Sequence, residues 1–429
     1  MIYNTAENKK IEEKYYYFKH ESGLDIYIFP KNHTTSYALF GTKYGSIDNT
    51  FKIKGEADFT VVPDGIAHFL EHKLFENEDG IHADRRFADT GAYSNAYTDF
   101  DKTCYLFSCS DNSEKFDKSL EILLDFVTHP YFTAESVKKE QGIIGQEIMM
   151  YEDNPEWQVY FQMMSNMYEK HSVRLDIAGT IESISKITPD ILYKCHKAFY
   201  NLYNMHLCIS GNITPEQIKK TADKILLKSP PFEIERYEYE EPKKINKTVA
   251  EKKLKVSKPL FNIGIKDCET GIYGKELAKK SAETDILTNM LFNKSSDFYT
   301  KLYSSGKINN KFSTGSEYHP EYGHWIFSGE SENPAEVMDE IIKELETQIK
   351  TGLDRENFER CKRAGYAASV TIFDNTENIA NAFINCVQKG YDILDLPKII
   401  ESVSFEDAAS RLRRIFKKEN FILSVINPI

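Results

Sequence analysis

The sequence predicts an α+β protein built from two similar units of about 200 residues each. Each half of the 429-residue chain begins with alternating apolar residues and then changes to a helical period. Each half also ends in an apolar strand, residues 205–212 and residues 421–427, which follows an amphipathic helix ending in an aromatic residue. The Pro-rich, charged stretch 229–250 predicts an exposed linker. We therefore expect domains at 1–228 and 251–429.

Period-two alternation predicts the strands, and apolar residues three and four apart predict the helices. In the first half, strands are predicted at 15–18, 24–29, 37–42, 93–97, 103–109 and 205–210. Helices are predicted there at 65–75, 84–89, 116–127, 134–151, 154–168 and 189–199, with one more beginning at 214. The second half has strand-like segments near 254–265, up to residue 330 and at 421–427. Its predicted helices are 274–293, 295–304, 334–350, 355–372 and 376–388.

The predicted helix 65–75 carries the strongest chemical signal in the sequence. His68, Glu71 and His72 share one face at helical spacing. A separate apolar row could bury the helix; it consists of Leu70 and Leu74. Two imidazoles four residues apart can hold one metal ion, with the carboxylate pointing into the same space. The order H-x-x-E-H reverses that of the H-E-x-x-H zinc proteases. The alternative is that two of the eleven histidines fall four apart on a buried helix by chance.

Catalytic zinc usually takes three protein ligands, so a third must come from elsewhere in the chain. Glu147 is a candidate, because the predicted helix 134–151 places it in an apolar stripe. The stripe consists of Ile143, Ile144, Met150 and Tyr151. A carboxylate in such a stripe needs compensation by a metal ion or a buried Arg. Glu140 lies two turns earlier on the same face, where it could steady a ligand or a bound substrate.

Composition limits the classes of partner. The net charge of −12 argues against nucleic acid or an anionic membrane as the main partner. No run of eighteen apolar residues occurs, so no membrane span is expected, and the first eight residues lack a signal-peptide core. Seven scattered cysteines without a C-x-x-C pair predict reduced thiols in a cytoplasmic protein.

The motif His68-Phe69-Leu70-Glu71-His72 resembles that of the pitrilysin (insulinase) family of zinc peptidases. Glu147 follows His72 by 75 residues and Glu140 stands seven before it, as the corresponding glutamates do in that family. Residues 91–105, 177–180 and 209–213 also fit. The resemblance implies half of a clam-shaped peptidase, in which each domain is a mixed, largely antiparallel sheet flanked by helices. The chain looks closest to the short bacterial and mitochondrial-processing branch.

The resemblance also implies roles for individual residues. The first domain would hold one Zn²⁺ per chain, and the second would lack the zinc motif. The implied zinc ligands are His68, His72 and Glu147, with Glu140 supporting them. Glu71 would take a proton from a zinc-held water and later give it to the leaving amine. The substrate, a peptide or unfolded polypeptide, would pair with an edge strand. The strand residues implied to bind it are Ser94, Asn95, Ala96 and Tyr97.

One departure from the family pattern concerns substrate binding. Active halves often carry an Arg and, seven residues later, a Tyr in the second domain, but Tyr303 and Asn310 stand at the apparent positions. We therefore expect a heterodimer with a homologous chain that supplies the Arg and Tyr, with a homodimer as the alternative. The rival functions are a non-catalytic scaffold subunit and a peptide-binding maturation subunit with the same fold.

Overall fold

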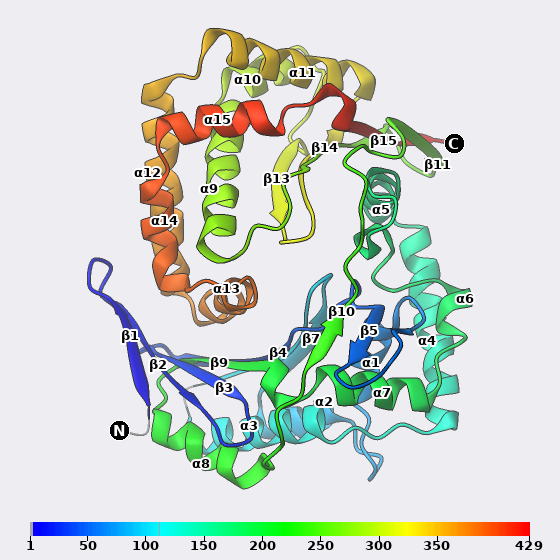
Figure 1. Cartoon of the computed structure of the whole chain (residues 1–429), viewed down its shortest axis with the longest axis vertical. Coiled ribbons are helices and arrows are strands. Elements are labelled where there is room, and N and C mark those ends of the chain that lie inside the picture. Colours follow the sequence, from blue (N-terminus) through cyan, green and yellow to red (C-terminus); the bar gives the residue numbers. More distant parts are fainter. Residues whose placement is uncertain (1–2, 111) are drawn as a thin grey trace. The chain divides into compact units, whose positions relative to one another are not determined.

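The computed structural model describes residues 3–110 and 112–429, which form two compact units (Figure 1). Unit 1 contains the described residues up to Ile148, together with Leu175–Glu238 and Ile372–Gln388. Unit 2 contains Met149–Arg174, Tyr239–Thr371 and Lys389–Ile429. None of the described helices combines the length and the apolar composition needed to cross a bilayer.

Unit 1 is built on a seven-stranded sheet in the order β1-β2-β3-β9-β4-β8-β7. Its strands are β1 (Asn4–Asn8), β2 (Glu13–Lys19), β3 (Asp25–Pro30), β4 (Thr35–Thr42), β7 (Tyr93–Thr98), β8 (Thr103–Ser110) and β9 (Met205–Gly211). Only β3 and β9 run parallel, and every other neighbouring pair is antiparallel. Every residue of β9 is buried, as expected of an apolar central strand. The sheet therefore leaves β7 at one edge.

Unit 2 repeats this arrangement in a five-stranded sheet with the order β11-β15-β12-β14-β13. Its strands are β11 (Val249–Leu254), β12 (Leu260–Lys266), β13 (Ser313–Tyr318), β14 (Gly323–Glu330) and β15 (Phe421–Pro428). The pair β11 and β15 is parallel and the rest are antiparallel. Both the order and the strand directions match β3-β9-β4-β8-β7. The predicted α+β fold of two homologous domains is therefore confirmed.

The helices follow the same order in both halves of the chain. Those of the first half are α1 (Ile66–Leu74), α2 (Ala83–Thr90), α3 (Ser113–Thr128), α4 (Ala134–Glu152), α5 (Pro155–Met167), α6 (Ile181–Ile184), α7 (Pro189–Phe199) and α8 (Pro215–Ile225). Those of the second half are α9 (Gly274–Leu291), α10 (Asp297–Ser304), α11 (Pro334–Thr351), α12 (Arg355–Thr371), α13 (Thr376–Gln388), α14 (Leu396–Ser402) and α15 (Phe405–Ile415). Several start as their sequences predict, with a Thr or Asn cap followed by Pro, as at α7 and α5.

Each unit takes one helix from the other half of the chain. In unit 1, α13 covers the face of the sheet formed by β4 and β9, opposite α3 (Figure 1). The ring of Phe383 lies 4.5 Å from that of Tyr27 and 5.3 Å from that of Phe29. In unit 2, α5 packs on β12 and β15, where a Cβ on Gly264 would lie 2.2 Å from Met167 Cε. The domains predicted from the sequence, 1–228 and 251–429, do not include this exchange of helices between the two halves.

The stretch 229–250 is not featureless. A second sheet of unit 1 has the order β10-β5-β6 and consists of β5 (Thr50–Ile53), β6 (Thr60–Val61) and β10 (Ile234–Arg236). Arg236 donates to Asp48 at 2.6 Å, which ties this part of the stretch to unit 1. None of these short strands is predicted from the sequence, because two to four residues are too few to show a period.

Candidate metal centre

Helix α1 begins at a point where the chain is held closely by a distant segment. Its cap, Gly65, has a φ of 87°, a left-handed conformation that favours glycine. A Cβ at Gly65 would lie 2.4 Å from the carbonyl oxygen of Ala178, and one at Gly179 would lie 2.5 Å from that of Asp64. Both glycines therefore allow two backbones to touch. The predicted apolar row is confirmed, since Leu70 and Leu74 are fully buried.

The structure brings His68, His72 and Glu147 together, with one possible ligand atom of each within 4.8 Å of the others. Nε2 of His68 lies 3.7 Å from one oxygen of Glu147, and Nε2 of His72 lies 3.5 Å from the other. These separations are too long for good hydrogen bonds. They are close to the spacing of about 3.4 Å between two ligand atoms each about 2.1 Å from a tetrahedral ion. The donor set and its spacing both fit zinc.

Glu140 bonds to the far side of His72. Its Oε1 lies 3.1 Å from Nδ1 of His72, and this contact leaves Nε2 facing Glu147. A carboxylate on the second nitrogen of a histidine commonly fixes its tautomer and orientation for metal binding. His68 has no such support, because its buried Nδ1 has no hydrogen-bond partner in the described chain.

Glu71 is buried beside the histidines and is not part of the ligand group. The hydroxyl of Thr98, the last residue of β7, donates to Oε2 of Glu71 at 2.6 Å. Glu71 thus keeps a carboxylate near the metal centre without being needed as a ligand. A carboxylate placed in this way can act as a general base.

Burial and neighbouring charges set the protonation of the cluster. Burial lowers the pKa of His68 to about 4, which keeps its imidazole neutral, as a metal ligand must be. Burial also lowers the pKa of His72, but the hydrogen bond to Glu140 and the nearby carboxylates outweigh it and leave this pKa raised. Burial raises the pKa of Glu71, against the hydrogen bond from Thr98. A bound cation would shift all three toward the deprotonated forms.

The four residues predicted to bind substrate form the middle of β7, which pairs only with β8 in the described sheet. These residues are Ser94, Asn95, Ala96 and Tyr97. Ser94 donates to Asp84, and the hydroxyl of Tyr97 donates to Asn381 of α13 at 2.9 Å. An edge strand of this kind presents backbone groups to which an extended peptide can pair.

The apolar stripe around Glu147 is buried only in part, since Ile144 is fully buried whereas Ile143 is 46% and Met150 59% exposed. Glu147 therefore needs less charge compensation than a fully buried carboxylate would, and the geometry supports it as a ligand independently. Thr98 is not predicted as a site residue, since nothing in a β-strand pattern shows which side chain contacts a helix from elsewhere in the chain.

Unit 2 has a network of buried ion pairs instead of histidines at the equivalent helix. Arg411, which is fully buried, bonds to Asp267 and donates to Tyr318 at 2.8 Å. Lys280 of α9 lies 3.0 Å from the same Asp267. Within the described residues, the only group with metal-ligand spacing is that of unit 1.

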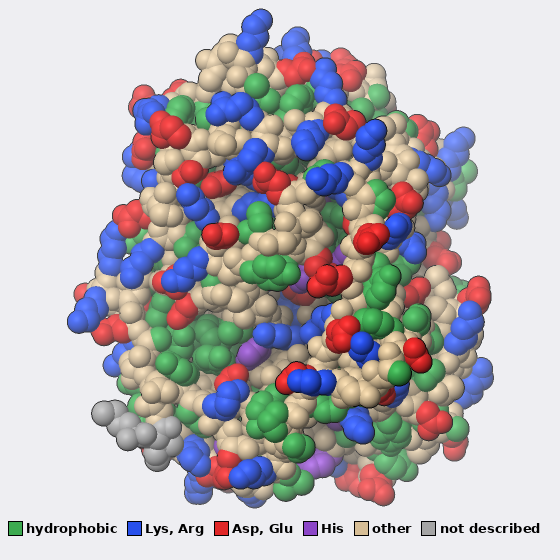
Figure 2. Space-filling model, in the orientation of Figure 1, with side chains coloured by type: hydrophobic (Ala, Val, Ile, Leu, Met, Phe, Trp, Pro, Cys, Tyr) green, Lys and Arg blue, Asp and Glu red, His purple; other side chains and the backbone are tan. Residues whose placement is uncertain are grey.

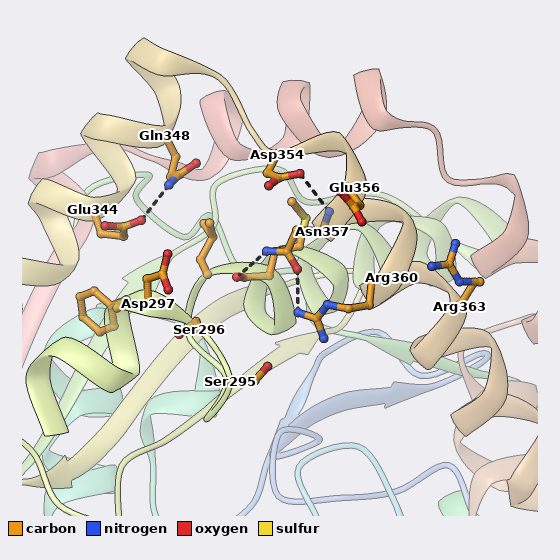
Figure 3. Close-up of a pocket in the computed structure, with 13 residues that line it drawn as sticks. Ser295, Ser296, Asp297, Glu344, Gln348, Asp354, Glu356, Asn357, Arg360 and Arg363 are labelled. Atoms are coloured by element: carbon orange, nitrogen blue, oxygen red, sulfur yellow. Dashed lines mark hydrogen bonds between the residues drawn. The ribbon is translucent and has the colours of Figure 1, made fainter. Parts of the chain in front are cut away.

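A polar cavity of about 420 Å³ lies in unit 2, lined by α11, α12 and the start of α10 (Figure 3). Four of its polar side chains bond to one another in two pairs. Arg360 donates to Asn357 at 2.7 Å, and Gln348 donates to Glu344 at 2.8 Å. We assign no ligand to this cavity.

On the face shown in Figure 2, acidic and basic side chains are interspersed, and no large patch carries charge of a single sign.

Comparison with known proteins decides the family. The profile described as Insulinase (Peptidase family M16) matches residues 62–181, and the one described as Peptidase M16 inactive domain matches residues 186–364. The uncharacterized zinc protease YmfH of Bacillus subtilis is 38% identical over 430 residues, 98% of each chain. The chain belongs to the insulinase family of peptidases.

Solved structures agree with this M16 assignment. An M16-like peptidase from Alicyclobacillus acidocaldarius superposes with a TM-score of 0.92 and 30% identity, covering 100% of this chain and 99% of that one. Pitrilysin has a TM-score of 0.77 at 14% identity, and the match covers 99% of this chain but 46% of pitrilysin. The M16 fold found here thus spans about half the length of pitrilysin.

Proposed function

We propose that this M16 chain is a zinc-dependent endopeptidase subunit that hydrolyses peptides or unfolded polypeptides. The observation that carries the proposal is the grouping of His68, His72 and Glu147, with a buried, non-ligating Glu71 beside them. Relatives named zinc proteases support the same chemistry. The N-terminal domain would carry the chemistry, and the C-terminal domain would contribute packing and substrate contacts.

In this proposal each residue has a distinct task. His68, His72 and Glu147 would hold one zinc ion, and Glu140 would keep His72 in its ligating orientation. When bound, zinc would polarise the scissile carbonyl and lower the pKa of a water. Glu71 accepts the proton of the attacking water and returns it to the leaving amine. An extended substrate pairs with β7 through Ser94, Asn95, Ala96 and Tyr97, so that its carbonyl lies near Glu71.

The test is hydrolysis of an unstructured fluorogenic peptide together with a zinc measurement. We expect about one zinc per chain, turnover that stops with a chelator, and recovery when zinc is restored. A chain that contains zinc but shows no chelator-sensitive turnover, alone or with a partner, would favour the rival functions. These are a non-catalytic scaffold and a peptide-binding maturation subunit, which would bind unstructured peptides without cleaving them.

We further propose that the chain works with a homologous partner of similar length. Tyr303, which is 51% exposed and stacks on Tyr299 at 5.6 Å, provides no cation where the Arg is expected. Asn310 is exposed and provides no phenol where the Tyr is expected. Arg411 is buried in its ion pairs. The partner would supply the Arg and Tyr pair, and a homodimer is the alternative.

Titration of the isolated chain with the partner tests this proposal. We expect turnover to rise with added partner and to saturate at one partner per chain. Full activity of the isolated chain, unchanged by the partner, would contradict the divided site.

For the cellular compartment, we propose the cytoplasm, because all seven cysteines are free and six of them are buried.

A further inference from the structure

Thr98 is the only residue of the described chain whose side chain donates a hydrogen bond to Glu71. Its hydroxyl lies 2.6 Å from Oε2 of Glu71. Thr98 is also the last residue of β7, the strand with the free edge, whereas Glu71 belongs to α1. One hydrogen bond therefore joins the metal-binding helix to the edge strand.

Neighbouring contacts hold the Thr98 hydroxyl in place. The strand pairs with β8 over six residues, in a register that sets Thr98 opposite Thr103. The two hydroxyls lie 3.4 Å apart, and Thr103 in turn donates to the backbone carbonyl of Tyr44 at 2.8 Å. A β-branched side chain has restricted χ1 freedom, so Thr98 presents its hydroxyl in one direction. Glu71, with three rotatable bonds, has no comparable restriction of its own.

We propose that Thr98 is a positioning residue that orients the Glu71 carboxylate for proton transfer. By donating to Oε2, Thr98 leaves Oε1 to accept the proton of the attacking water, and the hydroxyl proton stays on Thr98 throughout. Because Thr98 directly follows the proposed substrate-binding residues, the same strand aligns both the substrate and the base. This inference rests on the proposed function, in which Glu71 is the base.

Two substitutions separate the hydroxyl from the shape of the side chain. Thr98→Val keeps the β-branch and removes the donor, whereas Thr98→Ser keeps the donor. We expect Thr98→Val to lower kcat by about 10- to 100-fold with KM and zinc content unchanged, since misplacing a reacting group by about 1 Å costs rates of this order. Thr98→Ser should stay within about threefold of wild type. Thr90→Val, which removes a hydroxyl on α2, is the matched control and should leave kcat unchanged.

A second readout does not depend on activity. Crystal structures of the zinc-free variants should show Glu71 in one conformation with Thr98→Ser and rotated or disordered with Thr98→Val. On a Glu71→Gln background, Thr98→Val should cause no further loss of turnover, because the group it positions is already inactive. The assays use whichever assembly, chain alone or with partner, gives chelator-sensitive turnover.

The outcomes distinguish this inference from the proposed function. If wild type is active and Glu71→Gln is not, but Thr98→Val matches wild type, Thr98 does not position the base. Loss of zinc or a changed KM in Thr98→Val would also overturn the inference, because Thr98 would then act on the metal or on substrate binding. If Glu71→Gln retains wild-type turnover, the proposed function itself fails.

Discussion

Nδ1 of His72 and Oε1 of Glu140 lie 3.1 Å apart and join α1 to α4 on the side of the imidazole that faces away from Glu147. We predict that Glu140→Gln lowers zinc affinity by about tenfold, because it removes the charge that orients His72 and strengthens it as a ligand. Glu147→Gln should weaken zinc binding further, since it removes a ligand. Competition with a chromophoric chelator measures both affinities. Glu135→Gln, at the exposed first turn of α4, is the control, and equal affinities for Glu140→Gln and wild type would exclude the supporting role.

Glu71→Gln should retain the fold and about one zinc per chain while lowering kcat by about 10²- to 10⁴-fold, because only the proton acceptor is lost. Kinetics on an unstructured peptide, paired with metal analysis of the same sample, measure this. Glu78→Gln, on an exposed residue just beyond α1, should behave as wild type. Zinc loss combined with retained turnover would show that Glu71 is a ligand rather than the base.

Gly65→Ala should destabilise the chain and weaken zinc binding together. The new Cβ meets the backbone of Ala178 at 2.4 Å, in a left-handed conformation. We expect a loss of about 3 kcal/mol in the free energy of unfolding, from strain and overpacking combined. Gly55→Ala is the matched control, because Gly55 also has a positive φ but no atom within 4 Å of a new Cβ. It should cost about 1 kcal/mol with zinc binding unchanged. Equal losses in the two variants would show that the contact with Ala178 is unimportant.

Acid should destabilise the protein through buried neutral histidines, of which His206 on β9 is the clearest. Burial lowers the pKa of His206 to about 3, and neither ring nitrogen has a hydrogen-bond partner in the described chain. Well above pH 6.5 the imidazole is neutral in both the folded and the unfolded state, so its effect on stability is constant. As the pH falls through 6.5, only the unfolded chain takes up the proton, and the free energy of unfolding drops by about 1.6 kcal/mol between pH 6.5 and pH 5.

His206→Met should therefore reduce the loss of stability between pH 6.5 and pH 5, measured by urea unfolding at each pH. At pH 7 the variant should be as stable as wild type or more so, because an unsatisfied buried polar group has been removed. His33→Gln, in the connection between β3 and β4, should keep the wild-type pH dependence. The same dependence in His206→Met and wild type would assign the acid sensitivity to other groups, such as His324, whose pKa burial lowers to about 4.

The sequence by itself determined the α+β fold with its two homologous units, and it singled out His68, Glu71, His72, Glu140 and Glu147. Helices and strands can be predicted from local patterns, because the apolar period, the capping residues and the turn residues each act over only a few positions. The H-x-x-E-H spacing likewise fixes three side chains on one helical face, whatever the helix packs against.

Only the tertiary structure decided which side chains from separate elements meet. It placed Glu147 within reach of both histidines, joined Thr98 to Glu71, and set Gly65 against Ala178. It also exchanged α5 and α13 between the two halves and paired the short strand β10 with β5. These contacts depend on how distant segments pack, and a helix or a strand carries no local signal of its partner. A pattern of residues therefore predicts the groups that can react, whereas packing between elements sets their distances.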